Sequence, residues 1–274
     1  MTQSLDLSRL RLSLLSSPIH FELHDYATVG STQDLVAAAA AGGAEEGLVV
    51  FADEQLAGRG RSGRRWVAPP GSSLMFSVLL RPASSAANWT TLSLAAGLAV
   101  VEGLAQAGGP PTRLKWPNDC LVGDRKLAGV LAESRSSSER GRVVIVGIGC
   151  NVKWGGAELP SELRRTATAC DLAGYDVDRT SLAVAVLGRL GLRYQQWVDQ
   201  GFGALREAWL ARAAWIGQEV IAQQPSGPVA GRMAGLSEQG ELLLETASGP
   251  IAVAAGDLDL AVGSGLRLGS RGEG

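Results

Sequence analysis

Apolar residues along the chain follow two periods, one typical of strands and one typical of helices. Three mostly apolar runs, at 47–54, 74–81 and 142–149, are short and have glycine or proline nearby, which predicts buried strands. Apolar residues spaced three and four apart from Leu92 onward predict a helix over 88–108. Further helices are expected at 33–41, 181–198 and 202–214, and further strands at 113–116, 119–122 and 126–133.

The pattern changes after Trp215. Glycines then break the chain into runs of about five residues, and apolar and polar positions alternate within 241–245 and 251–253. Short, evenly spaced strands of this kind predict a small β-barrel. We therefore place a domain boundary near 214–217 and expect three parts, namely a leader that is loose apart from one or two helical turns, a main domain and a barrel, over 1–20, 21–214 and 215–270.

Composition and charge exclude several classes of protein. The chain has 25 Lys and Arg against 27 Asp and Glu, a formal net charge of −2, so no broad basic face for nucleic acid or an anionic membrane is expected. The sequence contains no run of about 18 apolar residues, so no membrane span is expected, and residues 1–15 lack the pattern of a signal peptide. Three scattered cysteines form neither a disulfide framework nor a CxxC metal site. An odd cysteine count fits a reducing compartment, and we expect a cytoplasmic protein.

Glycine and arginine are concentrated at 58–66, in the segment GRGRSGRRW. Alternating glycines let a backbone approach a ligand and turn its N–H groups toward an anion. The planar guanidinium matches carboxylate or phosphate oxygens. Such segments are more often solvated or in loose contact with RNA, but the position of this one between two predicted strands favours an ordered binding loop.

Three other segments carry candidate chemistry. In Lys115-Trp116-Pro117-Asn118-Asp119, the Asn-Asp pair either forms a turn or binds hydrated Mg²⁺, and the nearby cations favour a phosphate site. Lys126 begins a buried strand, where it either extends to water or meets a ligand, and Gly129 within that strand indicates close approach of a ligand or backbone. In 147–151, we expect the glycines to let Asn151 reach a ligand.

The order of these segments resembles that of biotin–protein ligases. The shared segments are GSTQ, Q-x-x-G-R-G-R-x-G-R-x-W, K-W-P-N-D, K-L-A-G-V-L-x-E and G-x-G-x-N, over about 28–152. The C-terminal piece resembles the family's SH3-like barrel. The resemblance implies an α+β fold in which a mixed sheet with flanking helices, similar to class II aminoacyl-tRNA synthetases, precedes the small barrel.

The resemblance also implies roles for individual residues. Residues implied in biotin binding are Ser31, Thr32, Gln33, Gln55, Arg59, Gly60, Arg61, Lys126 and Gly129. Residues implied in ATP binding are Arg61, Arg64, Trp66, Lys115, Asn118, Asp119 and Asn151. The implied catalytic residues are Lys126, Arg59, Arg61 and Lys115, and Asp119 is the candidate metal ligand. The family usually has asparagine where Gln33 stands.

The activity implied is that of a biotin–[acetyl-CoA-carboxylase] ligase. With ATP and Mg²⁺ it activates biotin to biotinyl-5′-adenylate, and it then transfers biotin to a lysine of a biotin carboxyl carrier domain. About 25 residues precede the GSTQ segment, too few for the DNA-binding domain of some members. We therefore expect the catalytic-only form, without specific DNA binding or membrane association, as a monomer or weak homodimer.

Two alternatives stay open. A lipoate or octanoate ligase or transferase shares the implied fold, but a lipoyl ring has no ureido group to match polar residues such as Ser31, Gln33 and Gln55. A nucleic-acid-binding protein could use the arginine loop on phosphates, although such proteins usually show a broad basic face.

Overall fold

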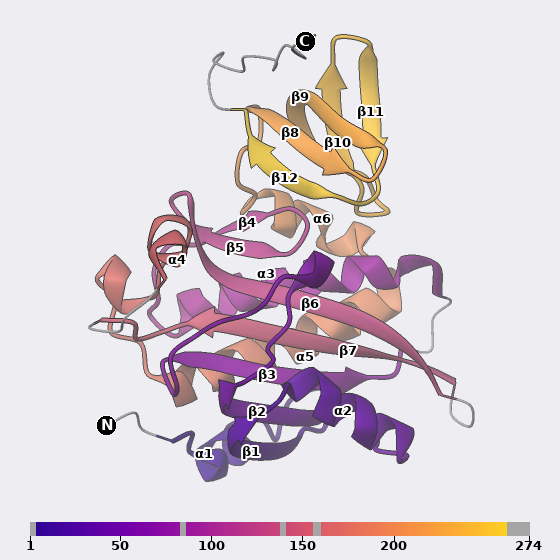
Figure 1. Ribbon diagram of the computed structural model, residues 1–274. Coiled ribbons are helices and arrows are strands. Elements are labelled where there is room, and N and C mark those ends of the chain that lie inside the picture. The colour runs from indigo at the N-terminus through magenta and orange to yellow at the C-terminus, as the bar shows by residue number, and fades with distance from the viewer. Residues whose placement is uncertain (1–3, 83–85, 138–140, 156–159, 262–274) are drawn as a thin grey trace, which may run out of the picture.

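A seven-stranded mixed sheet forms the centre of the computed structural model, which describes residues 4–82, 86–137, 141–155 and 160–261 (Figure 1). The strands are β1 (Glu22–Val29), β2 (Leu48–Gln55), β3 (Ser73–Leu80), β4 (Arg113–Lys115), β5 (Asp119–Val122), β6 (Arg125–Ser137) and β7 (Gly141–Asn151), in the order β1-β2-β3-β7-β6-β5-β4. Only β1 and β2 are parallel, because α2 crosses between them; the other neighbours are antiparallel. The predicted mixed sheet with flanking helices is confirmed.

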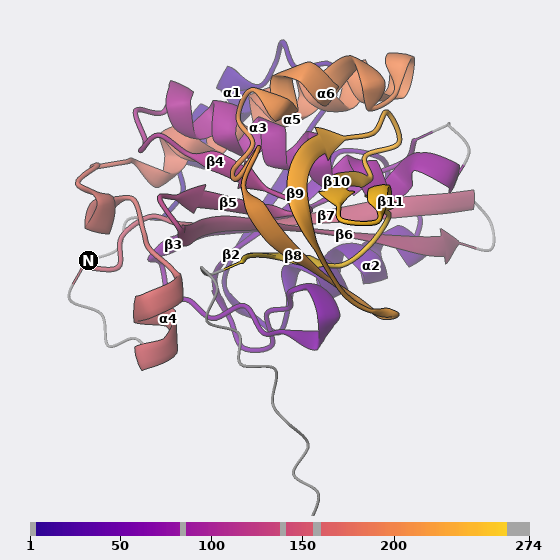
Figure 2. The same ribbon diagram turned by 90° about the horizontal axis from the view of Figure 1, so that it is seen from above.

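Helices cover both faces of this sheet. Figure 2 shows α3 (Leu92–Gln106), α5 (Arg179–Gln200) and α6 (Gly203–Leu210) on one side, and α2 (Thr32–Ala41) on the other. The short helix α1 (Leu7–Ser13) packs on α5, and α4 (Ser161–Thr166) contacts β6. Single 3₁₀ segments lie at Arg61–Gly63, Ala86–Thr91 and Asp171–Ala173.

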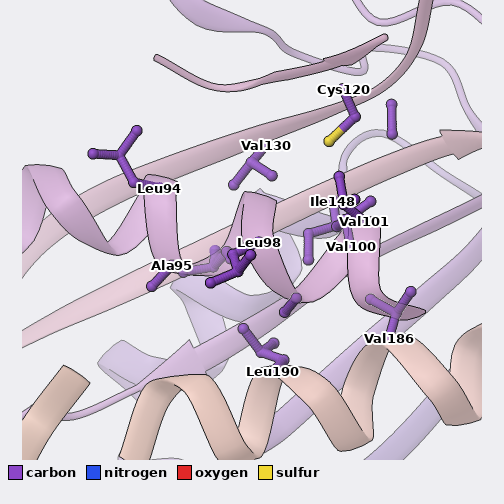
Figure 3. Close-up of a cluster of buried hydrophobic side chains, with 14 of the residues drawn as sticks. Leu94, Ala95, Leu98, Val100, Val101, Cys120, Val130, Ile148, Val186 and Leu190 are labelled. Carbon is purple, nitrogen blue, oxygen red and sulfur yellow. The ribbon is translucent and has the colours of Figure 1, made fainter. Parts of the chain in front are cut away.

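The two faces of the sheet differ in composition, and the difference positions the site. We call the side toward α3 and α5 the apolar face, and the side toward α2 the pocket face. On the apolar face, β7 contributes Val144, Val146, Ile148 and Cys150, and β3 contributes Leu74, Phe76, Val78 and Leu80, all in one buried cluster. Figure 3 shows the part of this cluster around Ile148. On the pocket face, the alternate residues of β7 pass from Val143 and Ile145 under α2 to Gly147 and Gly149. On β7, valine and isoleucine under α2 are therefore followed by glycine where the pocket begins.

The C-terminal part is a second, five-stranded antiparallel sheet. Its strands are β8 (Glu219–Gln224), β9 (Gly227–Leu236), β10 (Leu242–Thr246), β11 (Gly249–Val253) and β12 (Asp257–Leu260), in the order β11-β10-β9-β8-β12. It lies beyond β4 and β5 (Figure 1), and Trp116 Nε1 donates to the Gly240 carbonyl oxygen at 3.1 Å. Val220 and Met233 belong to the same buried cluster as the main core. This small sheet is consistent with the predicted SH3-like domain.

The N-terminal segment differs from the predicted loose leader. Leu5, Leu10, Leu14 and Ile19 are all buried in the main core. The Asp6 carboxylate accepts the Arg9 backbone N–H and so caps α1. Within the described residues, 4–20 are thus packed onto the main body.

No helix in the described ranges combines the length and the apolar character needed to cross a membrane.

Candidate active site

The pocket face holds a cleft, open to solvent, of about 710 Å³. It lies where α2 begins, where the strands β6 and β7 carry glycine, and where the arginine-rich loop 58–66 crosses the sheet. The residues predicted from the sequence that line it are Ser31, Thr32, Gln33, Gln55, Arg59, Gly60, Arg61, Arg64, Trp66, Asn118, Lys126 and Gly129. The fold therefore gathers segments that are up to a hundred residues apart in sequence into one space.

The floor of the cleft is built from paired glycines. Gly129 on β6 pairs with Gly149 on β7, and the Trp66 indole lies against both. A Cβ atom at Gly149 would stand 2.5 Å from the Trp66 ring, and one at Gly129 would stand 2.9 Å from Lys126 Nζ. Lys126 Nζ lies 5.6 Å from the centroid of the same ring. The glycines thus make room for the two side chains that form the inner end of the cleft.

The opposite wall is polar and only partly satisfied. The Gln55 Oε1 atom accepts the Thr32 backbone N–H at 2.9 Å, and the Thr32 and Ser77 hydroxyls lie 2.8 Å apart. Ser31 Oγ, Gln33 Oε1 and Trp66 Nε1 are buried without a hydrogen-bond partner. A buried polar atom without a partner costs about 1–3 kcal/mol, so these atoms favour a ligand that donates and accepts hydrogen bonds.

The first half of the arginine loop is held to α2 and β6. Arg59 Nη1 donates to Asp34 Oδ2 at 2.7 Å, and Arg59 Nη2 lies 3.5 Å from Glu133 Oε2. The hydrogen bond from Arg59 holds the pKa of the Asp34 carboxyl below its ordinary value, and the same contact raises the pKa of Arg59. This pair fixes one side of the cleft mouth with two opposite charges.

The second half of the loop is held to the small C-terminal sheet. Arg64 Nη2 donates to both carboxylate oxygens of Asp257 at 2.8 Å, and Arg61 Nη1 lies 3.5 Å from Asp257 Oδ1. Arg61 also donates to Asn118 Oδ1 at 3.4 Å. Between the two arginines, Ser62 takes a left-handed conformation (φ 55°), which a residue other than glycine adopts only at a cost. The loop is therefore anchored at both ends of the cleft.

The KWPND segment divides between the cleft and the domain contact. Asp119 lies 2.6 Å from Lys126 Nζ, and Asn118 Nδ2 donates to the Val130 carbonyl oxygen at 2.7 Å, beside the cleft. Lys115, in contrast, lies 3.5 Å from Asp259 and 5.2 Å from the Trp215 ring, and it does not line the cleft.

Asn151 is also placed away from the cleft. It is buried, its Nδ2 donates to the Thr168 carbonyl oxygen at 2.9 Å, and its Oδ1 accepts from Ser73 Oγ at 3.5 Å. From the sequence we expected the glycines to let Asn151 reach a ligand. The structure instead turns its side chain toward Thr168 and Ser73, away from the cleft. A Cβ atom at Gly147 would stand 3.2 Å from Gln33 Cδ, so Gly147 makes room for Gln33 instead.

Comparison with known proteins decides the family. A model of the Biotin/lipoate A/B protein ligase family matches residues 27–151, and a model of the Biotin protein ligase C terminal domain matches residues 215–260. The chain is 36% identical to the bifunctional ligase/repressor BirA of Bacillus subtilis, over 88% of this chain and 74% of that protein. It is 37% identical to the biotin–[acetyl-CoA-carboxylase] ligase of Mycobacterium tuberculosis, over 86% and 88%. This chain belongs to the biotin/lipoate A/B protein ligase family.

A solved structure of the family shares the fold. The biotin protein ligase from Aquifex aeolicus in complex with biotin and ATP is 32% identical to this chain, with a TM-score of 0.76, and the match covers 87% of this chain and 98% of that one. The segment that the family model matches, residues 27–151, includes the arginine loop and the cleft floor described above.

Sequence reasoning missed part of the family's site in this chain. The cleft is also lined by Arg65, Phe76, Ser77, Val130, Leu131, Gly147, Ile148 and Gly149. Ser77 could have been noticed as a single hydroxyl within the apolar run 74–81. Gly147 and Gly149 were noticed, but their role depends on Gln33 and Trp66, which lie far away in sequence.

Neither a metal cage nor a reactive thiol accompanies the cleft in the part of the chain that the structure describes. No group of three or more His, Cys, Asp or Glu side chains forms a metal site there, and the Asp119 carboxylate is already paired with Lys126. Burial raises the pKa of the Cys120 thiol, and a hydrogen bond with Cys170, together with burial, raises that of Cys150. The role of Asp119 as a metal ligand stays a prediction, and the buried thiols of Cys120 and Cys150 stay protonated and unreactive.

Proposed function

We propose that this protein is a biotin–protein ligase that activates biotin with ATP to biotinyl-5′-adenylate and then transfers biotin to a lysine of an acceptor protein. The observation that carries the proposal is the cleft itself. Its lining combines buried polar atoms without partners, Ser31 Oγ and Gln33 Oε1, with the cations Lys126, Arg61 and Arg64. A ligand that carries both a cyclic urea and a carboxylate matches this combination.

The first step joins a carboxylate to a nucleotide. A biotin carboxylate oxygen attacks the α-phosphorus of ATP, and the bond from that phosphorus to the bridging oxygen breaks, so that pyrophosphate leaves. The protein has little covalent work to do here, because positioning and charge stabilisation account for most catalysis of phosphoryl-type transfer. Lys126 and Arg61 are the cations at the inner end of the cleft and at its mouth, where developing negative charge would be stabilised.

The second step breaks the mixed anhydride. The ε-amine of the acceptor lysine attacks the acyl carbon, the acyl–oxygen bond breaks, AMP leaves, and the amine loses a proton. Water must be kept away from the anhydride until then, and the arginine loop, anchored by Asp34 and Asp257, is placed over the cleft to do so. We propose that Arg64 also meets the departing pyrophosphate.

We propose the biotin carboxyl carrier domain of acetyl-CoA carboxylase, or of a related carboxylase, as the acceptor, since similar proteins carry the name biotin–[acetyl-CoA-carboxylase] ligase. Asp119, beside Lys126, would help to hold the Mg²⁺ that accompanies ATP, since one carboxylate together with nucleotide phosphates commonly binds this ion. The absence of specific DNA binding and a monomeric or weakly dimeric state remain predictions, as do nucleotide contacts of Lys115 and Asn151.

Lipoate or octanoate is the nearest alternative substrate class. Neither offers an N–H donor to Gln33 Oε1, and neither would satisfy Ser31 Oγ. A buried acceptor left unpaired by the wrong substrate is a strong source of discrimination. The cleft therefore favours biotin.

The test is transfer to an acceptor. The purified protein is incubated with ATP, Mg²⁺, biotin and a carrier domain, and the attached biotin is measured by the mass of the carrier domain. We expect one biotin per carrier domain, and none on a carrier domain whose target lysine is arginine. Equal attachment of lipoate would move the chain to another activity within its family, and no attachment of either would refute the proposal.

A further inference from the structure

Glu133, a residue outside every predicted set of site residues, makes contacts that define the chemistry of the cleft. It lies on β6, on the pocket face, opposite Ile145 of β7. Its side chain is 28% exposed, and one carboxylate oxygen, Oε2, lies 3.3 Å from Gln33 Nε2, 3.5 Å from Arg59 Nη2 and 3.3 Å from Arg135 Nη2. One acidic group thus contacts both the inner wall and the loop.

The orientation of the Gln33 carboxamide follows from these contacts. Gln33 is 4% exposed, and its Nε2 donates to Glu133 Oε2 at 3.3 Å and to the Leu131 carbonyl oxygen at 3.4 Å. One partner is a backbone carbonyl oxygen and the other is a carboxylate that contacts two arginines, and both act as hydrogen-bond acceptors. Rotating the amide by 180° would set its oxygen against two acceptors. The Gln33 Oε1 atom must therefore face away from them.

That oxygen is the buried atom without a partner at the cleft wall. Gly147 leaves space for it, because a Cβ atom there would stand 3.4 Å from Gln33 Oε1. Since a carboxamide oxygen only accepts, the ligand group placed against it must be an N–H or O–H donor.

We propose that Glu133 is a positioning residue that sets which ligand ring the cleft selects. Through its contact with Nε2 it holds Gln33 Oε1 toward the cleft, so that this oxygen accepts an N–H of the cyclic urea. This inference rests on the proposed function, because it assigns a hydrogen bond to the ring of that substrate. The same carboxylate contacts Arg59, so the amide and the loop share one anchor.

The experiment measures selectivity rather than activity alone. Biotin and its two cyclic carbamate analogues, in which a ring oxygen replaces one or the other N–H, are titrated calorimetrically into the full chain. For the analogue whose oxygen meets Gln33 Oε1, two acceptors would face each other, and we expect binding weaker than that of biotin by on the order of a hundredfold.

Glu133→Gln is the decisive variant. A carboxamide at 133 can donate to Gln33 Oε1, so that only the Leu131 carbonyl oxygen still opposes the flipped amide, and presenting Nε2 to a ring oxygen becomes less costly. We expect biotin to bind about tenfold more weakly and its preference over that analogue to fall about tenfold or more. Glu133→Asp keeps the negative charge, but its shorter side chain moves the carboxylate away from Gln33 Nε2. If Glu133→Gln does not fold, Glu133→Asp takes its place, and we expect a smaller loss of the preference for biotin.

Control variants separate this role from a general effect of charge. Glu22→Gln removes one negative charge from the edge strand β1, where Glu22 contacts His24 and does not line the cleft, and the preference should not change. Asp34→Asn releases Arg59 without touching the amide, so it too should keep the preference. In a Gln33→Leu background, Glu133→Gln should alter the preference no further.

Three results would overturn the inference. The first is an unchanged preference for biotin in folded Glu133→Gln. The second is that Glu133→Gln changes the preference as much in the Gln33→Leu background as in the wild type. The third is that Asp34→Asn changes the preference as much as Glu133→Gln does. Failure of the wild type to bind biotin at all would instead refute the proposed function, and the inference with it.

Discussion

The apolar face and the pocket face of the same sheet are built from alternate residues of the same strands. On the apolar face, Val130 and Ile148 pack with Leu98 of α3 and Leu190 of α5, without polar side chains among them (Figure 3). On the pocket face, at neighbouring positions of the same strands, Gly129 and its pairing partner Gly149 leave space for the side chains of Trp66 and Lys126. One face supplies stability through burial, and the other gives up burial for a ligand.

The largest expected effect of a single change is at Lys126, the cation of the pocket face. Lys126→Ala should lower adenylate formation by a hundredfold or more, because a charge at a water-poor phosphate site contributes several kcal/mol in the transition state, about 1.4 kcal/mol per tenfold. Biotin-dependent ATP–pyrophosphate exchange measures this loss, and circular dichroism checks the fold. Lys115→Ala should cost less than Lys126→Ala, because Lys115 contacts Asp259 outside the cleft, and a loss above about fivefold would support its predicted nucleotide contact. Equal losses of adenylate formation in the two variants would show that a lysine's position outside the cleft does not lessen its contribution to catalysis.

The second prediction compares one substitution on each face of the sheet. Gly149→Val on the pocket face should displace the Trp66 ring, 2.5 Å from the new Cβ atom, and lower exchange by about tenfold to a hundredfold with little loss of folded protein. Leu98→Ala on the apolar face should cost about 2–5 kcal/mol of unfolding free energy, by denaturant titration, and keep activity per folded molecule. A Gly149→Val protein with full activity would contradict the proposed role of the cleft floor.

The third prediction concerns the anchor of the arginine loop in the small sheet. Asp257→Asn removes the charge that holds Arg64 and Arg61, so the loop should close less completely. Adenylate should then escape about fivefold to thirtyfold faster and acylate lysines of serum albumin added as a bystander. Arg61→Gly should act in the same direction. Adenylate formation with no more albumin labelling than wild type would show that this anchor does not retain the intermediate.

The smallest predicted effect is at Asp25 of the edge strand β1, beside Asp53 and Arg179, the first residue of α5. Burial chiefly, and then Asp53, raise the pKa of Asp25, so the folded state holds this proton more tightly than the unfolded state. The stability from this group is complete below about pH 3.8 and is lost as pH rises through the higher folded pKa. Because Asp25 is only half-buried, Asp25→Asn should add only about half a kcal/mol at pH 7 and nothing at pH 3. An equal gain at both pH values would exclude a titration effect.

The sequence predicted the elements whose pattern is continuous. The strand at 74–81 and the helix that begins near Leu92 are examples, because uninterrupted burial leaves a clear period in the residues. The edge strand β1 was missed, since Asp25 and His24 interrupt its alternation and only one of its sides is paired. The packing of α1 was missed because its leucines contact α5, far along the chain.

The candidate site was predictable to the extent that it lies in contiguous motifs. Of the cleft-lining residues in the GSTQ and arginine segments, all except Arg65 were named from the sequence. What the sequence could not give are contacts between distant positions, such as Arg64 with Asp257, which lie 193 residues apart, or Gln33 with Glu133. Nor could it show that Lys115 lies against the small sheet, because a lysine beside a tryptophan is compatible with either direction.

The central claim is that the cleft selects biotin for activation, and ATP–pyrophosphate exchange tests it most directly. Purified protein is given labelled pyrophosphate, ATP and Mg²⁺, with biotin, lipoate or octanoate in separate reactions. We expect exchange with biotin, and a rate with lipoate or octanoate lower by on the order of a hundredfold or more, because these substrates offer Gln33 Oε1 and Ser31 Oγ no hydrogen-bond partner. Exchange driven equally well by lipoate would contradict it.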